Sequence, residues 1–175
     1  MAGINEMKPW SRGGTTGNLG LSWGWRTLSP RWRGLWGGDT PSIHPLDYGT
    51  PLMEKVVVIL TDGQNQFHKQ TSLPSDFTAY GRVNSPGPVG LDASSIANGR
   101  NELDDRMEDT CEDMKDEGVR IYTITFGSTP DSQARELFRD CATTPALYYH
   151  APDNATLANV FRAIGGELAN LRIVE

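Results

Sequence analysis

The sequence predicts an α/β protein whose core is a parallel β-sheet. Five consecutive apolar residues, from Val56 to Leu60, are typical of a strand that is covered on both faces, as strands of parallel sheets are. Strands and amphipathic helices then alternate along the rest of the chain, in the order strand, helix, strand, helix, strand, helix. This alternation implies right-handed crossovers and therefore parallel pairing of the strands.

A helix is expected over residues 100–117, and a second strand over residues 121–126 follows it. Gly118, just beyond the helix, is a typical helix stop. The apolar face of this helix consists of Leu103, Met107, Cys111 and Met114. Nine acidic residues lie between Glu102 and Glu117, and we interpret them as a solvated helix face rather than as a calcium-binding loop, because the apolar residues keep helical spacing.

Two further helices and a third strand complete the pattern. One helix is expected to begin at Thr129-Pro130, with threonine as the cap and proline in the first turn. Its apolar face consists of Ala134, Leu137, Phe138 and Cys141. A short strand over residues 147–150 follows, and Asp153 or Asn154 then caps the last helix. The inner face of that helix consists of Leu157, Val160, Phe161, Ile164, Leu168 and Leu171.

Length and composition indicate one loop-rich domain. The 175 residues are 37% hydrophobic, which is enough for a single core. Residues 29–50 and 64–99 look like loops, whereas residues 51–63 and 100–175 look regular. The net charge of −6 disfavours wholesale binding to nucleic acid, which needs clustered basic residues. We expect neither a membrane anchor nor a signal peptide in this chain, because no sufficiently long apolar stretch occurs.

The candidate functional site follows the first strand. Asp62, in the run Thr61-Asp62-Gly63, comes directly after that strand, and ligands of open parallel sheets bind beyond the carboxyl ends of strands. Upstream, the run from Gly13 to Gly17 presents the Thr15 hydroxyl in a turn ahead of a helix. A carboxylate and a hydroxyl at one edge suit a hard cation such as Mg²⁺. The alternative is that Asp62 only caps the loop after the strand.

Several runs resemble a known family. Val-Val-Val-Ile-Leu-Thr-Asp-Gly at residues 56–63, preceded by Gly-Gly-Thr at residues 13–15, resembles the later half of a von Willebrand factor A domain. Residues 23–30, 121–127 and 168–172 are similar to TadG-like proteins of bacterial Tad (Flp) pilus assembly, which carry an A domain at their carboxyl end. The resemblance covers nearly the whole chain. It implies a parallel doubly wound, Rossmann-like sheet, with residues 1–175 forming a partial A domain that lacks its amino-terminal strands.

The resemblance also implies a metal-ion-dependent adhesion site. Thr15 and Asp62 match two of the family's metal ligands. The family's Asp-x-Ser-x-Ser run has no match here, and the nearest string, Asp92-Ala93-Ser94-Ser95, has the wrong spacing. We therefore expect an incomplete site that binds Mg²⁺, Mn²⁺ or Ca²⁺ weakly.

The function that the resemblance implies is non-enzymatic. The chain would be an adhesion or assembly module of a Tad pilus system that binds a protein partner. It would lie outside the cytoplasm, in the periplasm or at the cell surface, and full-length family members are membrane-anchored. Two alternatives stay open. One is a metal-assisted hydrolase that uses Asp62, which is disfavoured because no second acid or base converges by spacing. The other is a truncated remnant without a ligand.

The sequence has three further features that bear on its stability and its contacts. Cys111 and Cys141 are either buried free thiols or a disulfide, and the extracytoplasmic location that the resemblance implies favours the disulfide. If the family's first strand is missing, the strand from Val56 to Leu60 becomes a sheet edge through which the chain self-associates. A cluster that is either core or a partner surface contains Trp23, Trp25, Trp32 and Trp36 together with Arg26, Arg31 and Arg33.

Overall fold

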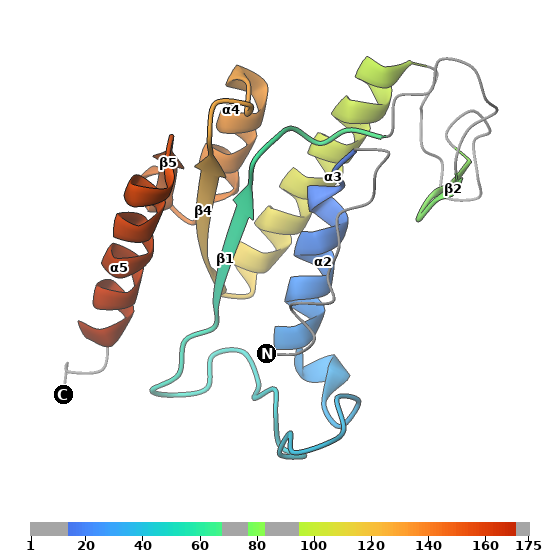
Figure 1. The fold of residues 1–175 in the computed structure, drawn as a ribbon. Helices are drawn as coiled ribbons and strands as arrows, with labels where there is room; N and C mark the ends of the chain where they lie inside the picture. Colours follow the sequence, from blue (N-terminus) through green and yellow to red (C-terminus); the bar gives the residue numbers. More distant parts are fainter. Residues whose placement is uncertain (1–13, 68–76, 83–94, 171–175) are drawn as a thin grey trace.

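Helices cover both faces of a short parallel sheet in the computed structural model, which describes residues 14–67, 77–82 and 95–170 (Figure 1). The described helices and strands are, in chain order, α2 (Gly17–Leu28), the 3₁₀ turn η1 (Pro30–Trp32), β1 (Val56–Thr61), β2 (Phe77–Thr78), β3 (Gly81–Arg82), α3 (Ile96–Asp116), β4 (Arg120–Phe126), α4 (Ser132–Cys141), the 3₁₀ turn η2 (Pro145–Leu147), β5 (Tyr148–Ala151) and α5 (Asn154–Asn170). The strands β2 and β3 form a separate antiparallel hairpin.

The main sheet has three strands in the order β1-β4-β5, and both pairings are parallel. Val56 pairs with Arg120 at the start of the β1–β4 ladder, and Thr61 pairs with Thr125 at its end. The central strand β4 is the most deeply buried, with Ile121, Tyr122 and Ile124 fully inaccessible to solvent. The predicted α/β class and the parallel pairing are therefore confirmed.

The core consists of two clusters, one on each face of the sheet. Helices α2, α3 and α4 pack against one face, where Leu21, Met107 and Leu137 meet Ile121 of β4. Helix α5 packs against the other face and contributes Val160 and Ile164. Within the first cluster, Cys111 of α3 and Cys141 of α4 form a disulfide, with their Cα atoms 5.2 Å apart.

The outer edge of β1 has no strand beside it among the described residues, because β4 is its only sheet neighbour there. Val57 and Ile59 pack into the core beneath α2 and α3. On the opposite face, Val58 and Leu60 are 39% and 41% exposed, since α5 packs over β4 and β5 instead. The prediction of a strand covered on both faces was therefore wrong for this face.

Two helices begin at other residues than predicted, and for the last helix the structure decides between two candidate caps. All three helix starts have a side-chain cap. Helix α3 begins at Ile96 because the Ser95 hydroxyl accepts a hydrogen bond from the Asn98 N–H at 3.0 Å. Helix α4 begins after Asp131, whose carboxylate accepts from the Ala134 N–H, so the prediction of Thr129 as cap was wrong. At the start of α5, Asp153 rather than Asn154 accepts from a backbone N–H.

The inner face predicted for the last helix also needs a correction. Phe161 is 47% exposed, so it does not belong to the core as predicted. The cluster beneath α5 is built from Val160 and Ile164 of the helix and from residues of β4 and β5, and Phe161 is not part of it. Leu171 lies outside the described residues.

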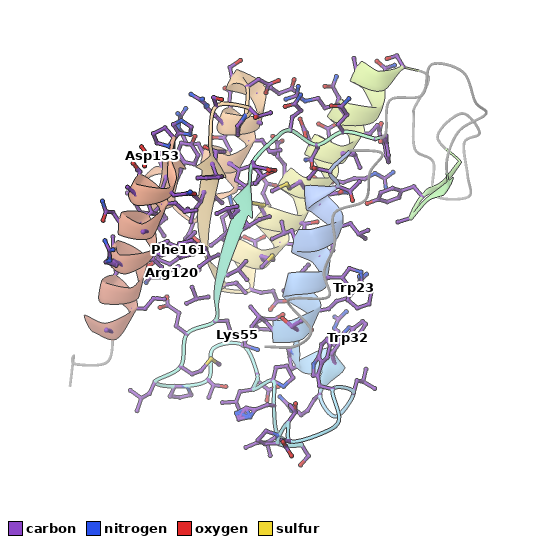
Figure 2. All side chains as sticks on the ribbon, viewed as in Figure 1. Trp23, Trp32, Lys55, Arg120, Asp153 and Phe161 are labelled. Carbon is purple, nitrogen blue, oxygen red and sulfur yellow. A yellow bond between two sulfur atoms is a disulfide. The ribbon has the colours of Figure 1, made fainter. Side chains whose placement is uncertain are left out.

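Lys55 fixes the segment between α2 and β1 at the amino end of the sheet (Figure 2). Lys55 is buried, and its ammonium group donates hydrogen bonds to the carbonyl oxygens of Leu28 and Leu46. It also lies 4.4 Å from the centre of the Tyr48 ring, and the Tyr48 hydroxyl accepts a hydrogen bond from the Trp25 indole N–H. Burial lowers the pKa of Lys55, and the charge of Asp47 acts in the opposite direction. The loop-like segment is thus tied to both elements that flank it.

Candidate functional site

The Thr15 segment lies against the loop that follows β1. The Thr15 N–H donates to the Gln66 carbonyl oxygen, and the Gln66 N–H donates back to the Thr15 carbonyl oxygen, both at 2.8 Å. Asp62 lies four residues before Gln66 in the same loop. The side chains of Thr15 and Asp62 are both exposed. The structure therefore joins the two segments that carry the candidate ligands, at the carboxyl end of β1.

A short turn begins the loop after β1. The Thr61 side chain is buried, and its hydroxyl donates to the Gly63 carbonyl oxygen at 2.9 Å. The Gly63 N–H lies 3.3 Å from the same hydroxyl oxygen. The turn is held by Thr61 and leaves the Asp62 carboxylate facing solvent just beyond the strand.

A buried asparagine connects this loop to the start of α2. Asn65 is 5% exposed, and its side-chain carbonyl oxygen accepts a hydrogen bond from the Gly17 N–H at 2.7 Å. A Cβ atom at residue 17 would lie only 2.9 Å from that oxygen. The close approach therefore requires glycine at this position, directly after the turn that presents Thr15.

Asp104 of α3 anchors the other side of the Asn65 amide. One carboxylate oxygen accepts from the Asn65 amide nitrogen, and the other accepts from the Gln133 amide nitrogen, both at 2.8 Å. The Arg100 guanidinium lies 3.6 Å away. Burial raises the pKa of Asp104, while the hydrogen bond from Asn65 and the charge of Arg100 act in the opposite direction. Because both of its oxygens accept hydrogen bonds, Asp104 is a structural carboxylate.

Arg100 extends the network to α4. Its guanidinium forms two hydrogen bonds with the Asp131 carboxylate, at 2.6 and 2.7 Å. These bonds lower the pKa of Asp131 to about 2. Since Asp131 is also the cap of α4, the network ties the candidate site to the amino ends of two helices.

The described residues do not complete a cation site. Within residues 14–67, 77–82 and 95–170, no group of three or more His, Cys, Asp or Glu side chains is arranged to hold a metal ion. Thr15 and Asp62 offer two oxygen ligands, whereas Mg²⁺ needs about six. Of the Asp-x-Ser-x-Ser-like string, residues 92–94 lie outside the described residues, and the Ser95 hydroxyl caps α3.

Sequence reasoning missed the network around Asp104. The acidic run was predicted to be a solvated face, which is wrong for Asp104, only 6% exposed. A signal was present, because Asp104 precedes Met107 by three residues and so lies on the apolar stripe of the helix. Asn65 carried no comparable signal, since its partners are distant in sequence.

Comparisons with known proteins add little to this description. No protein-family model and no curated protein matches the sequence. Two structures of proximal thread matrix protein 1 from the mussel byssus are similar, at 16% identity with a TM-score of 0.47 and at 17% identity with a TM-score of 0.37. The alignments cover 93% and 65% of this chain but only 27% and 19% of those chains. Likeness at this level carries no argument about function.

One further property of the described residues concerns membranes. None of the helices found there combines the length and the apolar character that crossing a bilayer requires.

Proposed function

We propose that the chain is a non-enzymatic adhesion or assembly module, built on part of a von Willebrand A-type fold, that binds a protein partner where β1 ends. The observation that carries the proposal is the pairing of Thr15 with Gln66, which brings the Thr15 segment to the loop that begins at Asp62. A divalent ion at this edge would take the Thr15 hydroxyl and the Asp62 carboxylate as ligands. The remaining ligands would be water and an acidic group of the partner.

The proposed biological setting is a bacterial Tad (Flp) pilus system, outside the cytoplasm. The sequence runs described above support the family, and the disulfide supports the compartment. Cys111 and Cys141 are bonded and lie in the core, and structural disulfides persist in oxidising compartments.

The hydrolase alternative is less favoured by the geometry. A metal-assisted hydrolase would need an acid or base close to Asp62. His68 lies outside the described residues, and the histidine that the structure describes in the sheet, His150, lies on β5, with β4 between it and β1. Two strand spacings of about 5 Å each therefore separate the strands. The His150 ring is also engaged, because its Nδ1 lies 3.0 Å from the Thr125 hydroxyl.

Isothermal titration with Mg²⁺ and Mn²⁺ tests the proposal. We expect binding with a dissociation constant on the order of millimolar, the weak end for oxygen-ligand sites, because this chain offers only two ligands. Asp62→Ala and Thr15→Ala should remove that binding. Asp105→Ala is the matched control, since it removes an exposed carboxylate from the acidic face of α3 and should leave binding unchanged.

Two results would contradict the proposal. A micromolar site that Asp62→Ala abolishes would mean that other residues complete the site, so that the expected incompleteness was wrong. Binding that is absent, or that falls equally in the Asp62 and Asp105 variants, would favour a remnant without a specific ion site.

A further inference from the structure

Exposed apolar side chains gather at the end of the molecule opposite the candidate site. The segment between α2 and β1 runs along the end where β1 begins (Figure 1). On this segment Leu35 is 68% exposed, Ile43 is 61% exposed and Leu52 is completely exposed. Isolated exposed apolar residues are normal, but a concentration of them marks an interaction surface.

A hollow opens on the same segment. It has a volume of about 780 Å³, and Trp36, His44 and Met53 are among the residues that line it. Leu35, Ile43 and Leu52 each directly precede one of these lining residues in sequence. These three exposed residues therefore lie on the same segment as the hollow, whereas Val58, Leu60 and Phe161 are exposed elsewhere, on β1 and α5.

A row of tryptophans extends this surface along α2. The rings of Trp23 and Trp32, whose labels lie close together in Figure 2, meet edge to face with their centres 5.6 Å apart. Trp32 stacks on Trp36 at 5.7 Å, and the Arg26 guanidinium lies 4.9 Å from the centre of the Trp23 ring. Trp23 remains 49% exposed and Trp36 remains 38% exposed. We call Trp23, Trp32, Leu35, Trp36, Ile43 and Leu52 the tip surface.

Leu52 presents its side chain to solvent from a tight turn. Its φ angle of 61° lies in the left-handed region, which leucine disfavours. Its side chain makes up for none of this strain by packing, because it is completely exposed. The Met53 N–H donates to the Thr50 carbonyl oxygen at 3.2 Å, so Leu52 is the third residue of a β-turn that has Pro51 as its second, and a positive φ at that place belongs to the turn.

The charge of this end differs from that of the whole chain. Residues 23–53 hold three arginines and two aspartates, a net charge of +1, whereas the chain has −6. Arg33 pairs with Asp47 at 2.8 Å. Arg26 and Arg31 form no ion pair with another described residue. An anionic surface would therefore attract this end and repel the acidic face of α3, which would orient the molecule with the tip surface toward it.

We propose that the tip surface docks on a lipid bilayer. Tryptophan and arginine are suited to the membrane–water interface, where the ring is apolar and the polar atoms stay hydrated. Separate apolar side chains on successive turns can each enter the interfacial region without a partner of matching shape. A protein interface, by contrast, concentrates its apolar area in a packed centre. The shape of the tip surface thus favours a lipid surface over a protein.

Vesicle binding by the full chain tests the proposal. The probes are phosphatidylcholine vesicles with and without phosphatidylglycerol, and the readouts are co-sedimentation and quenching of tryptophan fluorescence by brominated lipid. We expect binding that is stronger with the anionic lipid. Leu52→Asn should weaken it about tenfold, since the apolar transfer of one leucine is worth about a factor of ten or more.

Leu52→Asn separates binding from folding, because asparagine tolerates a positive φ and should not destabilise the fold. Leu60→Ser is the matched control: it removes an exposed leucine at the β1 edge and should leave vesicle binding unchanged. Failure to bind either vesicle would overturn the proposal, and so would equal loss in both variants. Concentration-dependent dimerisation that Leu52→Asn abolishes would overturn it in favour of an interface between two copies.

Discussion

Asn65 and Asp104 are hydrogen-bonded side chain to side chain at 2.8 Å, although 39 residues separate them in sequence. The same Asn65 amide accepts a hydrogen bond from the Gly17 N–H. A single buried side chain thus sets the spacing between the loop after β1 and the start of α2. Thr15 and Asp62 lie on these two segments. The hydrogen bonds of Asn65 therefore determine whether the oxygen atoms of Thr15 and Asp62 can face a common ligand.

We predict that Gly17→Ala destabilises the protein. The new Cβ would lie 2.9 Å from the Asn65 oxygen, so the hydrogen bond to residue 17 would break and leave buried polar groups unpaired. The expected loss in the free energy of unfolding is about 1–3 kcal/mol, measured by urea denaturation. Gly20→Ala, in the same helix, meets nothing within 4 Å and should gain roughly 0.5 kcal/mol. Equal effects of the two substitutions would contradict this account of Asn65.

The Arg100–Asp131 pair predicts that the free energy of unfolding depends on pH in the acidic range. Because the pKa of Asp131 is about 2 in the folded protein and ordinarily 3.8, its contribution is complete above pH 3.8 and is lost as the pH falls toward 2. Asp131→Asn keeps a capping side chain but removes the charge. The contribution is at most about 1 kcal/mol, since the Asp131 side chain is 43% exposed. Urea denaturation at pH 7, 4, 3 and 2 should show wild type and variant converging below pH 4. A difference in the free energy of unfolding between wild type and variant that stays the same at all four pH values would show that the charge of Asp131 does not contribute in this way.

Removing the disulfide should cost substantial stability. Cys111 and Cys141 are 30 residues apart in sequence, and closing a loop of that length contributes roughly 3 kcal/mol in the chain-entropy model. We expect the Cys111→Ala/Cys141→Ala double variant to lose about this amount in urea denaturation. Reduced wild-type protein is the control, because it lacks the disulfide but keeps both cysteine side chains. Quantitative labelling of two thiols in native, unreduced protein would show that the bond does not form.

The open edge of β1 predicts self-association. Val58 and Leu60 are partly exposed on the face that α5 leaves uncovered, beside a strand edge with no described neighbour. Such an edge is a template for pairing, and lysine blocks it. We expect light scattering after size-exclusion chromatography to show association that increases with concentration and that Val58→Lys/Leu60→Lys suppresses. A monodisperse monomer with strong amide protection along residues 56–60 would mean that another segment covers the edge.

Local patterns in the sequence were sufficient to predict β1, α3, β4, α4, β5 and α5, but the hairpin of β2 and β3 and the first residues of α3 lie in residues 64–99, where a loop was wrongly predicted. The β-branched run of β1, the apolar stripes of α3 and α4, and the alternation of strands and helices all appear as expected. Errors occurred where a non-local contact decides the outcome. Whether Val58 or Phe161 is buried depends on where α5 crosses the sheet, which no window of sequence contains. The start of α4 moved to Asp131 because that carboxylate, not Thr129, accepts the hydrogen bond of the first turn.

The candidate site was predictable only in its exposed parts. Thr15 and Asp62 follow from turn and strand-end patterns, which are local. The buried residues that position them come from three separate elements, and Asp104 was hidden among acidic residues that do face solvent. An acidic residue three positions before a buried methionine is the one pattern that could have revealed it.

Paramagnetic relaxation by Mn²⁺, observed residue by residue in amide NMR spectra, tests most directly whether the functional edge lies where β1 ends. At low Mn²⁺ concentration, we predict that the amide signals of Thr15, Asp62 and Gly63 broaden first, and that Asp62→Ala removes this effect. Broadening that is confined to the acidic face of α3, around Asp105 and Asp109, or that persists in the Asp62 variant, would contradict the assignment of the site.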